Sequence, residues 1–193
     1  VYKRQYLRDP LYKNSLFMML AAVVSAFFGF IFWMIAARLY SAEDVGIATA
    51  LRASVALIVL LTRFGFGFSL IRFFPLKNKA KIFATSSTVT TSFALIFGIL
   101  FVLQVDFLAP NLNLLKYPLF FCIFLATILL NSILSLVAQA FIALRKAEFY
   151  FIQSTILGFR FIFLFFLMFF GAMGIFSSIT LALFLALFLM ILI

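Results

Sequence analysis

The spacing of the charged residues is the feature that most constrains the fold of this 193-residue chain. Residues 14–37, 82–105 and 117–144 contain no Asp, Glu, Lys or Arg, which gives uncharged runs of 24, 24 and 28 residues. A helix needs about 20 residues, at about 1.5 Å per residue, to cross the hydrocarbon layer of a bilayer. Each run is therefore long enough to form a transmembrane helix.

The rest of the chain supplies three more predicted spans. The segment after Asp44 is apolar except for Arg52 and Arg63, and the sequence after Glu148 is apolar except for Arg160. A glycine step, Gly-Ala-Met-Gly at 171–174, divides this last stretch in two. We therefore predict an all-α, polytopic membrane bundle in which residues 1–193 form one six-helix lobe. The predicted helices are 14–38, 43–70, 82–107, 117–143, 147–170 and 174–193.

The composition indicates a membrane protein and argues against several other classes of protein. The chain is 67% hydrophobic and 10% charged, whereas soluble domains are about 45–50% apolar and about 25% charged. Histidine is absent and Cys122 is the only cysteine, which excludes a disulfide framework and a Cys/His metal site within this chain. No nucleotide-binding, hydrolase or metalloprotease motif is present. We expect no metal, no cofactor and no enzymatic activity.

The basic residues are distributed unequally between the two sides of the predicted bundle. Ten fall on the side of the N-terminus: Lys3, Arg4, Arg8, Lys13, Arg72, Lys77, Lys79, Lys81, Arg145 and Lys146. The other side has Arg38 and Lys116 beside three acidic residues. Because Lys and Arg concentrate in cytoplasmic loops, we expect a multi-pass protein of the cytoplasmic membrane with its N-terminus in the cytoplasm. The basic residues that give the chain its net charge of +10 then face the head groups of the membrane, and we expect no nucleic-acid partner.

Arg52 is the most informative polar residue within a predicted span. An arginine at a helix centre costs roughly 2.5–3.5 kcal/mol on insertion scales, and each Leu, Ile, Val or Phe returns about 0.3–0.6 kcal/mol. Arg63, near the inner interface, can extend its side chain to the lipid head groups. Arg52 lies about 12 Å inward from Asp44 and has no such exit. We therefore expect Arg52 to face a cavity or a polar partner.

Other polar side chains extend this prediction to neighbouring helices. Arg160 lies about 18 Å inward from Glu148, with Gln153 seven residues earlier on the same helical face. Asn131, Ser135 and Gln139 form one stripe at a spacing of four residues. The simpler alternative is that these groups form contacts between helices. No acidic residue falls within a span, so a shared cavity would be cationic and would favour an anionic substrate.

Several segments resemble the polysaccharide (O-antigen type) flippases of the multidrug/oligosaccharidyl-lipid/polysaccharide exporter superfamily. Asn14 followed by "GFIFWMIAARLYSAEDVGIATALRA" is similar to the first two helices and their short loop. "RFGFGFSLIRFFP" is similar to the Gly-rich end of the second helix, and "ALRKAEFYFIQSTI" resembles the basic loop before the fifth. Arg63 departs from the family pattern, which often has a polar or acidic residue there.

The resemblance implies two six-helix lobes that alternate between inward-open and outward-open states, of which this chain would be the N-terminal lobe. The implied substrate is an isoprenoid-pyrophosphate-linked oligosaccharide, an anionic diphosphate lipid that the protein flips across the bilayer. Arg52 and Arg160 are our candidates for contact with its head group, and Asn131, Gln139 and Gln153 are candidates for the cavity lining. The chain stops within the apolar run "LALFLALFLMILI", which agrees with a missing C-terminal lobe of the same protein.

Two alternatives stay open at the level of sequence. One is an ion-coupled exporter of drugs or metabolites from the same superfamily, which would need an acidic residue in the missing lobe. The other is a non-transporting membrane subunit of a polysaccharide synthesis complex, in which the arginines would be structural. A membrane glycosyltransferase is disfavoured, because such enzymes usually need acidic residues in sizeable loops and the loops here are short.

Overall fold

The fold is a bundle of long helices, six of which are long and apolar enough to cross a membrane. A computed structural model describes residues 10–63, 65–74 and 78–192, and no strand occurs among them. The all-α fold class is confirmed, and the protein is a multi-pass membrane protein. Its α-helices are α2 (Pro10–Leu39), α3 (Ala42–Thr62), α4 (Phe66–Phe73), α5 (Lys79–Leu103), α6 (Val105–Leu108), α7 (Pro118–Ala143), α8 (Ala147–Gly158), α9 (Phe161–Phe166) and α10 (Gly171–Leu192), with short 3₁₀ helices η1 (Pro110–Lys116) and η2 (Met168–Phe170).

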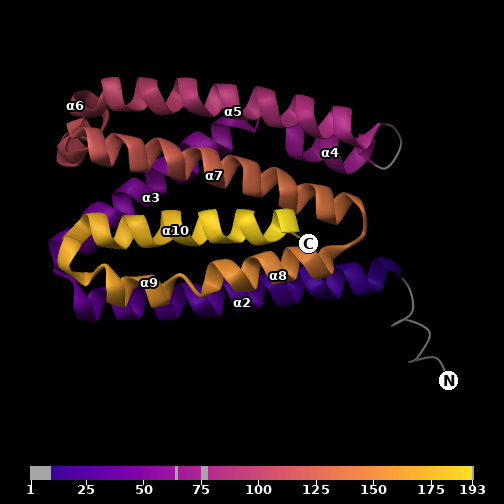
Figure 1. Cartoon of the computed structure of the whole chain (residues 1–193), viewed down its shortest axis with the longest axis horizontal. Helices are drawn as coiled ribbons and strands as arrows, with labels where there is room; N and C mark the ends of the chain where they lie inside the picture. Colours follow the sequence, from indigo (N-terminus) through magenta and orange to yellow (C-terminus); the bar gives the residue numbers. More distant parts are fainter. Residues whose placement is uncertain (1–9, 64, 75–77, 193) are drawn as a thin grey trace.

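The long helices lie side by side and run alternately up and down the bundle (Figure 1). Helix α2 packs along α8 and α9, α5 packs along α7, and α10 contacts α3, α7 and α8. Helix α10 is therefore the central element, and it holds the two outer pairs of helices together. Because six spans return the chain toward its starting side, α10 runs toward the end of the bundle at which α2 begins (Figure 1).

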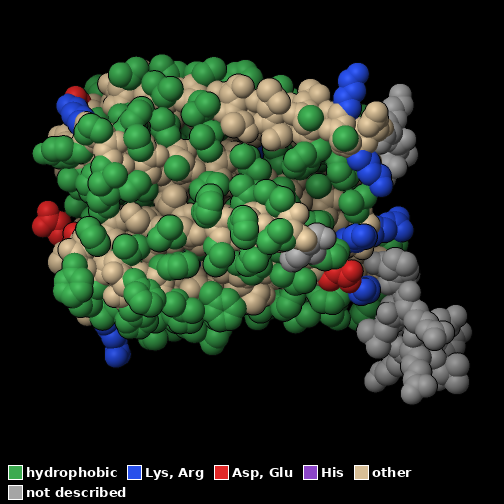
Figure 2. Space-filling model, in the orientation of Figure 1, with side chains coloured by type: hydrophobic (Ala, Val, Ile, Leu, Met, Phe, Trp, Pro, Cys, Tyr) green, Lys and Arg blue, Asp and Glu red, His purple; other side chains and the backbone are tan. Residues whose placement is uncertain are grey.

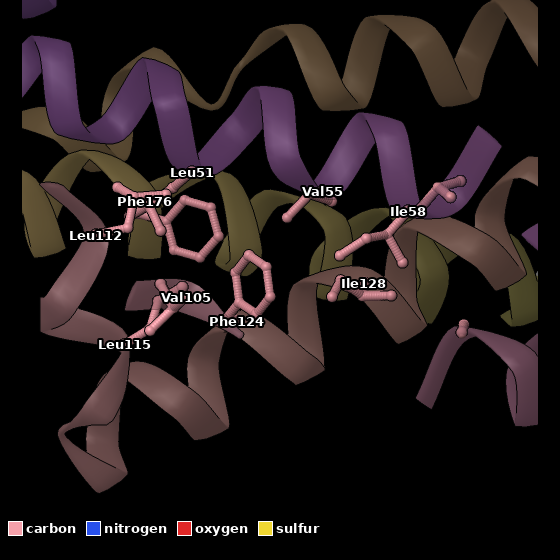
Figure 3. Close-up of a cluster of buried hydrophobic side chains, with 11 residues drawn as sticks. Leu51, Val55, Ile58, Val105, Leu112, Leu115, Phe124, Ile128 and Phe176 are labelled. Atoms are coloured by element: carbon pink, nitrogen blue, oxygen red, sulfur yellow. The ribbon is translucent and has the colours of Figure 1, made fainter. Parts of the chain in front are cut away.

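Two groups of buried apolar side chains hold the helices together. The larger one joins α3, α5, α7 and α10, and includes Phe124 and Phe176, whose ring centroids are 6.3 Å apart (Figure 3). The Phe101 ring of α5 packs against this group, with its centroid 5.7 Å from that of Phe124. The second group joins α2, α7, α9 and α10 around Phe32 and Ile175. Lipid competes for apolar contacts inside a membrane, so such close packing, rather than exclusion of water, stabilises the bundle.

Besides a break at Gln104, between α5 and α6 near the end of the span predicted at 82–107, two of the predicted spans are interrupted, which corrects the sequence-based boundaries. The span predicted at 43–70 ends as α3 at Thr62, and Gly65, with φ of +76°, separates it from α4. A positive φ is accessible to glycine at little cost, so Gly65 permits the break. The span predicted at 147–170 consists of α8 and α9, separated by Phe159 and Arg160. The second break places Arg160 at a discontinuity rather than within a continuous helix.

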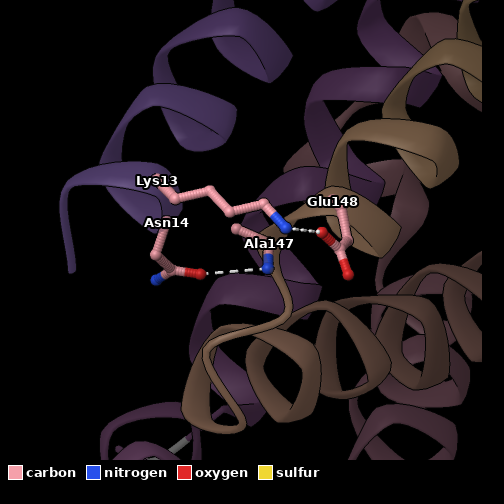
Figure 4. A network of polar contacts seen from close by, with 4 residues as sticks. All are labelled: Lys13, Asn14, Ala147 and Glu148. Atoms are coloured by element: carbon pink, nitrogen blue, oxygen red, sulfur yellow. Dashed lines mark hydrogen bonds and ion pairs between the residues drawn. The ribbon is translucent and has the colours of Figure 1, made fainter. Parts of the chain in front are cut away.

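Charged side chains occupy the two ends of the bundle and leave a hydrophobic band between them (Figure 2). The end where α2 begins carries the described cations Lys13, Arg72, Lys79, Lys81, Arg145 and Lys146. Lys3, Arg4, Arg8 and Lys77 lie outside the described residues. At this end Lys13 Nζ pairs with Glu148 at 2.6 Å, and Asn14 Oδ1 accepts the Ala147 N–H at 3.0 Å (Figure 4). Asn14 lies within α2, and its side chain caps the start of α8.

Side chains from the start of α3 fix the connection between α9 and α10 at the opposite end. Asp44 Oδ1 accepts the Ala172 N–H at 2.8 Å and so caps α10, while its Oδ2 accepts the Ser41 hydroxyl at 2.7 Å. The buried Tyr40 hydroxyl donates to the Leu164 carbonyl at 2.9 Å. Burial, and then the charge of Asp44, raise the pKa of Tyr40 above its usual value of 10.0. The phenol therefore stays protonated and remains a donor.

We expect Tyr40→Phe to lower the free energy of unfolding by about 1–2 kcal/mol, because the Leu164 carbonyl loses its donor in a buried position. A folded-state pKa above the unfolded one means that this contribution is complete below about pH 10 and is lost as the pH rises further. The difference between parent and variant should therefore shrink above pH 10. Thermal unfolding in detergent at pH 8 and pH 10.5 checks this, and a difference that stays constant across that range would contradict the assignment.

Candidate functional site

A cavity of about 230 Å³ lies within the bundle, between α2, α3, α7, α8 and α10. Its lining includes both arginines predicted to face a cavity, Arg52 and Arg160. Arg52 is ten residues from either end of α3, Ala42 or Thr62, and thus about 15 Å from each end. The cavity is therefore near the middle of the hydrophobic band. It reaches the surface beside Ser25, an exposed lining residue of α2.

Arg160 is positioned by the break between α8 and α9. Its guanidinium carbon lies 4.5 Å from the centroid of the Phe32 ring on α2, within the range of a cation–π interaction. Gly29 of α2 lies beside it, since a Cβ at that position would be 3.8 Å from Arg160 Nη2, an ordinary van der Waals contact. The Nε of Arg160 is buried and has no hydrogen-bond partner among the described residues. Arg160 is thus held in place by an aromatic ring while its hydrogen-bonding capacity remains partly unused.

Arg52 and Asn131 separate this cavity from a second, smaller one. The second cavity, of about 70 Å³, is lined by Arg52, Asn131 and Thr127 among others. The Thr127 and Thr180 hydroxyls are 2.6 Å apart, which joins α7 to α10 beside it. Arg52 is half-buried and borders both spaces. A guanidinium in this position can donate to a ligand in the larger cavity while its other side stays solvated or hydrogen-bonded.

The positive charge of the cavity has no carboxylate to balance it. Within the described residues the ion pairs are Lys13–Glu148 and Lys116–Asp106, both at the ends of the bundle. Arg52 and Arg160 line the same cavity, so their charges repel each other. Two like charges in a weakly polar surrounding raise the energy of the empty site, because burial strengthens their repulsion. An anion bound between them would relieve that repulsion and gain charge-assisted hydrogen bonds.

Gln153 adds a fixed hydrogen-bond acceptor to the cavity lining. Its Nε2 donates to the Leu134 carbonyl at 3.1 Å, and a carbonyl can only accept, so the orientation of the amide is determined. The residue is 4% exposed, and its Oε1 has no partner among the described residues. The site therefore combines two cationic donors with one neutral acceptor, a set suited to an anionic group that also carries a hydroxyl or a bound water.

The structure brings together four of the five residues proposed from sequence. Arg52, Arg160, Asn131 and Gln153 line the one cavity. Gln139 does not, because it lies eight residues further along α7, about 12 Å away, and packs against Gly67 of α4. Sequence reasoning missed the other nine lining residues, among them Ser25, Gly29, Tyr150 and Ser154. A usable signal was present, since Ser25 and Gly29 are four residues apart on one face of α2.

Other polar side chains of the spans lie outside the cavity. Arg63 follows the last residue of α3 and is half-buried, with its Nε unpaired among the described residues, outside the cavity. The hydroxyl-rich start of α5 contributes no lining residue to the cavity. The described residues contain no cluster of three or more His, Cys, Asp or Glu side chains suited to a metal.

No protein-family model, curated protein or solved structure matches this chain. The function must therefore be argued from the geometry and the charge of the cavity.

Proposed function

We propose that this protein is a transporter that flips an isoprenoid-diphosphate-linked oligosaccharide across the cytoplasmic membrane by alternating access. The chain would form one of two lobes, and the arginine cavity would face the other lobe. The observation that carries this proposal is that Arg52 and Arg160, neither of them paired with any of the described carboxylates, line one cavity at mid-membrane depth. Substrate sites of such transporters typically lie near the bilayer midplane, at breaks in transmembrane helices.

The physical obstacle to flipping such a lipid is the diphosphate. An ion-sized charge moved from water into a medium of low dielectric loses on the order of 20 kcal/mol of solvation in the idealised case. Guanidinium groups replace part of that hydration because they donate paired hydrogen bonds to phosphate oxygens and stay charged at any physiological pH. Arg52 from α3 and Arg160 from the α8–α9 break approach the cavity from two different helices, so an anion can bind between them.

The size of the cavity indicates which part of the substrate it takes. Its volume of about 230 Å³ is below the range of about 300–1,000 Å³ that is usual for drug-sized ligands. A diphosphate group and the start of the first sugar fit a cavity of this volume, whereas a whole oligosaccharide does not. In the proposed mechanism the glycan occupies the space between the lobes, and the isoprenoid tail remains in the bilayer. No bond is made or broken, so the mechanism requires no catalytic residue.

The distribution of charge supports the proposed orientation. The described cations gather at the end where α2 begins, whereas Glu43, Asp44 and Asp106 lie at the other end. By the positive-inside rule the N-terminal end would face the cytoplasm. Two cations also lie at the opposite end, but Lys116 is paired there with Asp106 at 2.7 Å.

The test is translocation by the purified complete protein in sealed vesicles. We expect movement of an isoprenoid-diphosphate-linked sugar, and at least tenfold slower movement of the same glycan on a neutral lipid. Equal rates for both lipids would contradict recognition of the diphosphate. Transport that requires an ion gradient and accepts substrates without phosphate would favour the ion-coupled exporter, and no translocation at all would favour the non-transporting subunit.

A further inference from the structure

A separate groove lies between α4 and α5, at the end of the bundle where α2 begins. It has a volume of about 590 Å³ and shares no residue with the arginine cavity. One wall is formed by Phe66 and Phe73, which are seven residues apart and lie on one face of α4. The floor is formed by Ile82 and the buried Ser86 of α5. The inner part of this groove is thus mainly apolar, and its side chains are too sparse to fill it.

The rim of the groove is cationic. Lys81 lines it directly, and the Arg72 guanidinium carbon lies 5.6 Å from the centroid of the Phe73 ring. The sequence from 66 to 86 contains no Asp or Glu, and the described ion pairs involve neither cation. Asn78, at the mouth of the groove, adds an uncharged side-chain amide. Two cations without an acidic partner at the mouth of an apolar groove match an amphiphile with a negatively charged head.

We propose that this groove binds an anionic phospholipid of the surrounding membrane, with an acyl chain against Phe66, Phe73 and Ile82 and the phosphate beside Lys81. Basic pockets between transmembrane helices are known sites for anionic lipid head groups. The depth fits, because Lys81 lies in the first turn of α5 (Lys79–Leu103), at the level of the head groups. The proposal does not depend on the transport function and requires only that the helices span a membrane.

The groove also has a consequence for the break between α3 and α4. Helix α4 is joined to α3 through Gly65 in a left-handed conformation, and α4 is only eight residues long. Leu70 and the adjoining Phe74 pack with Leu136 and Ala140 of α7, and the Phe74 ring also contacts Phe83 of α5. A bound lipid would fill the other side of this short helix and so stabilise its position against α5.

The test uses the quenching of tryptophan by lipids with brominated acyl chains. Trp33 is the only tryptophan, so a Trp33→Phe background carrying Phe73→Trp reports on the groove alone. In phosphatidylcholine vesicles we expect brominated phosphatidylglycerol to associate about fivefold more strongly than brominated phosphatidylcholine, the preference that one lysine near the surface provides. Lys81→Gln should reduce the preference to about one. Lys79→Gln, which removes the same charge outside the groove lining, should leave most of it.

A matched reporter separates groove binding from general attraction to the surface. Phe68 lies on α4, is 82% exposed and does not line the groove, so Phe68→Trp should show no preference between the two lipids. The proposal would be overturned if tryptophans at positions 68 and 73 reported the same preference for phosphatidylglycerol over phosphatidylcholine. It would also be overturned if that preference persisted in Lys81→Gln. Resistance of Phe73→Trp to both quenchers would also overturn it, because protein rather than lipid would then cover the groove.

Discussion

An Arg52→Gln variant should flip an isoprenoid-diphosphate lipid at least about tenfold more slowly than the parent protein at the same protein level. Hydrogen bonds to charged groups contribute about 1.5–3 kcal/mol, and each 1.4 kcal/mol corresponds to a factor of ten. Glutamine keeps a polar side chain in the cavity but removes the charge and the paired donors. No described carboxylate pairs with Arg52, so the substitution should not leave an unpaired acid behind. The rate of lipid translocation in sealed vesicles measures the effect.

Two matched variants make this prediction specific. Arg38→Gln removes the same charge from an exposed position at the end of α2 and should transport at the parental rate. Arg52→Lys keeps the charge but not the planar, paired donors and should fall between the parent and Arg52→Gln. A rate for Arg52→Gln equal to that of the parent would remove Arg52 from the mechanism. The same would hold for Arg160, whose Phe32 contact fixes it in the cavity.

Gly174→Ala should lower the free energy of unfolding by about 1–3 kcal/mol, the usual cost of inserting an atom into a well-packed site. A Cβ at this position of α10 would collide with the Leu167 carbonyl oxygen and would lie 3.2 Å from the Tyr40 hydroxyl. The carbonyl belongs to the backbone and cannot rotate away as a side chain would. Either the turn between α9 and α10 shifts or the Tyr40–Leu164 hydrogen bond is lost. Thermal unfolding in detergent measures the effect.

Gly46→Ala is the matched control for this substitution. Gly46 lies in α3, is exposed, and has no atom within 4 Å of a Cβ placed on it. Alanine favours a helix more than glycine does, by up to about 1 kcal/mol, so the control should be neutral or slightly stabilising. If Gly174→Ala were as harmless as Gly46→Ala, the close approach of α10 to the end of α9 would be wrong.

The number and type of the helices could be predicted from the sequence because each span is an apolar run bounded by charge. All six predicted spans correspond to helices or helix pairs in the structure. The glycines around Gly65 indicate a possible break there, although a glycine within an apolar run does not always interrupt a helix. The break at Arg160 follows Gly158, whose missing side chain admits the Phe28 ring of α2. That contact joins distant segments, and a local sequence pattern does not contain it.

The site could be predicted only as a set of residue types. The cost of placing arginine at mid-depth identified Arg52 and Arg160 without a structure. Which helices meet there was not predictable, because the spans are apolar on nearly every face and hydropathy does not fix their rotation. Gln139 illustrates this limit: it shares a stripe with Asn131 but packs beside Gly67, away from the cavity.

The most direct test of the central claim measures whether the cavity contains water that admits anions. In a Cys122→Ser background, Ser25→Cys places a thiol in the lining, and Ala26→Cys places one at the next residue, which is exposed but outside the lining. Thiols react as thiolates, which need an aqueous surrounding. A membrane-impermeant anionic thiosulfonate should therefore modify position 25 but not position 26, and inorganic pyrophosphate should slow the reaction. If the thiosulfonate modified neither position, the cavity would be dry, which would contradict an anion-binding cavity.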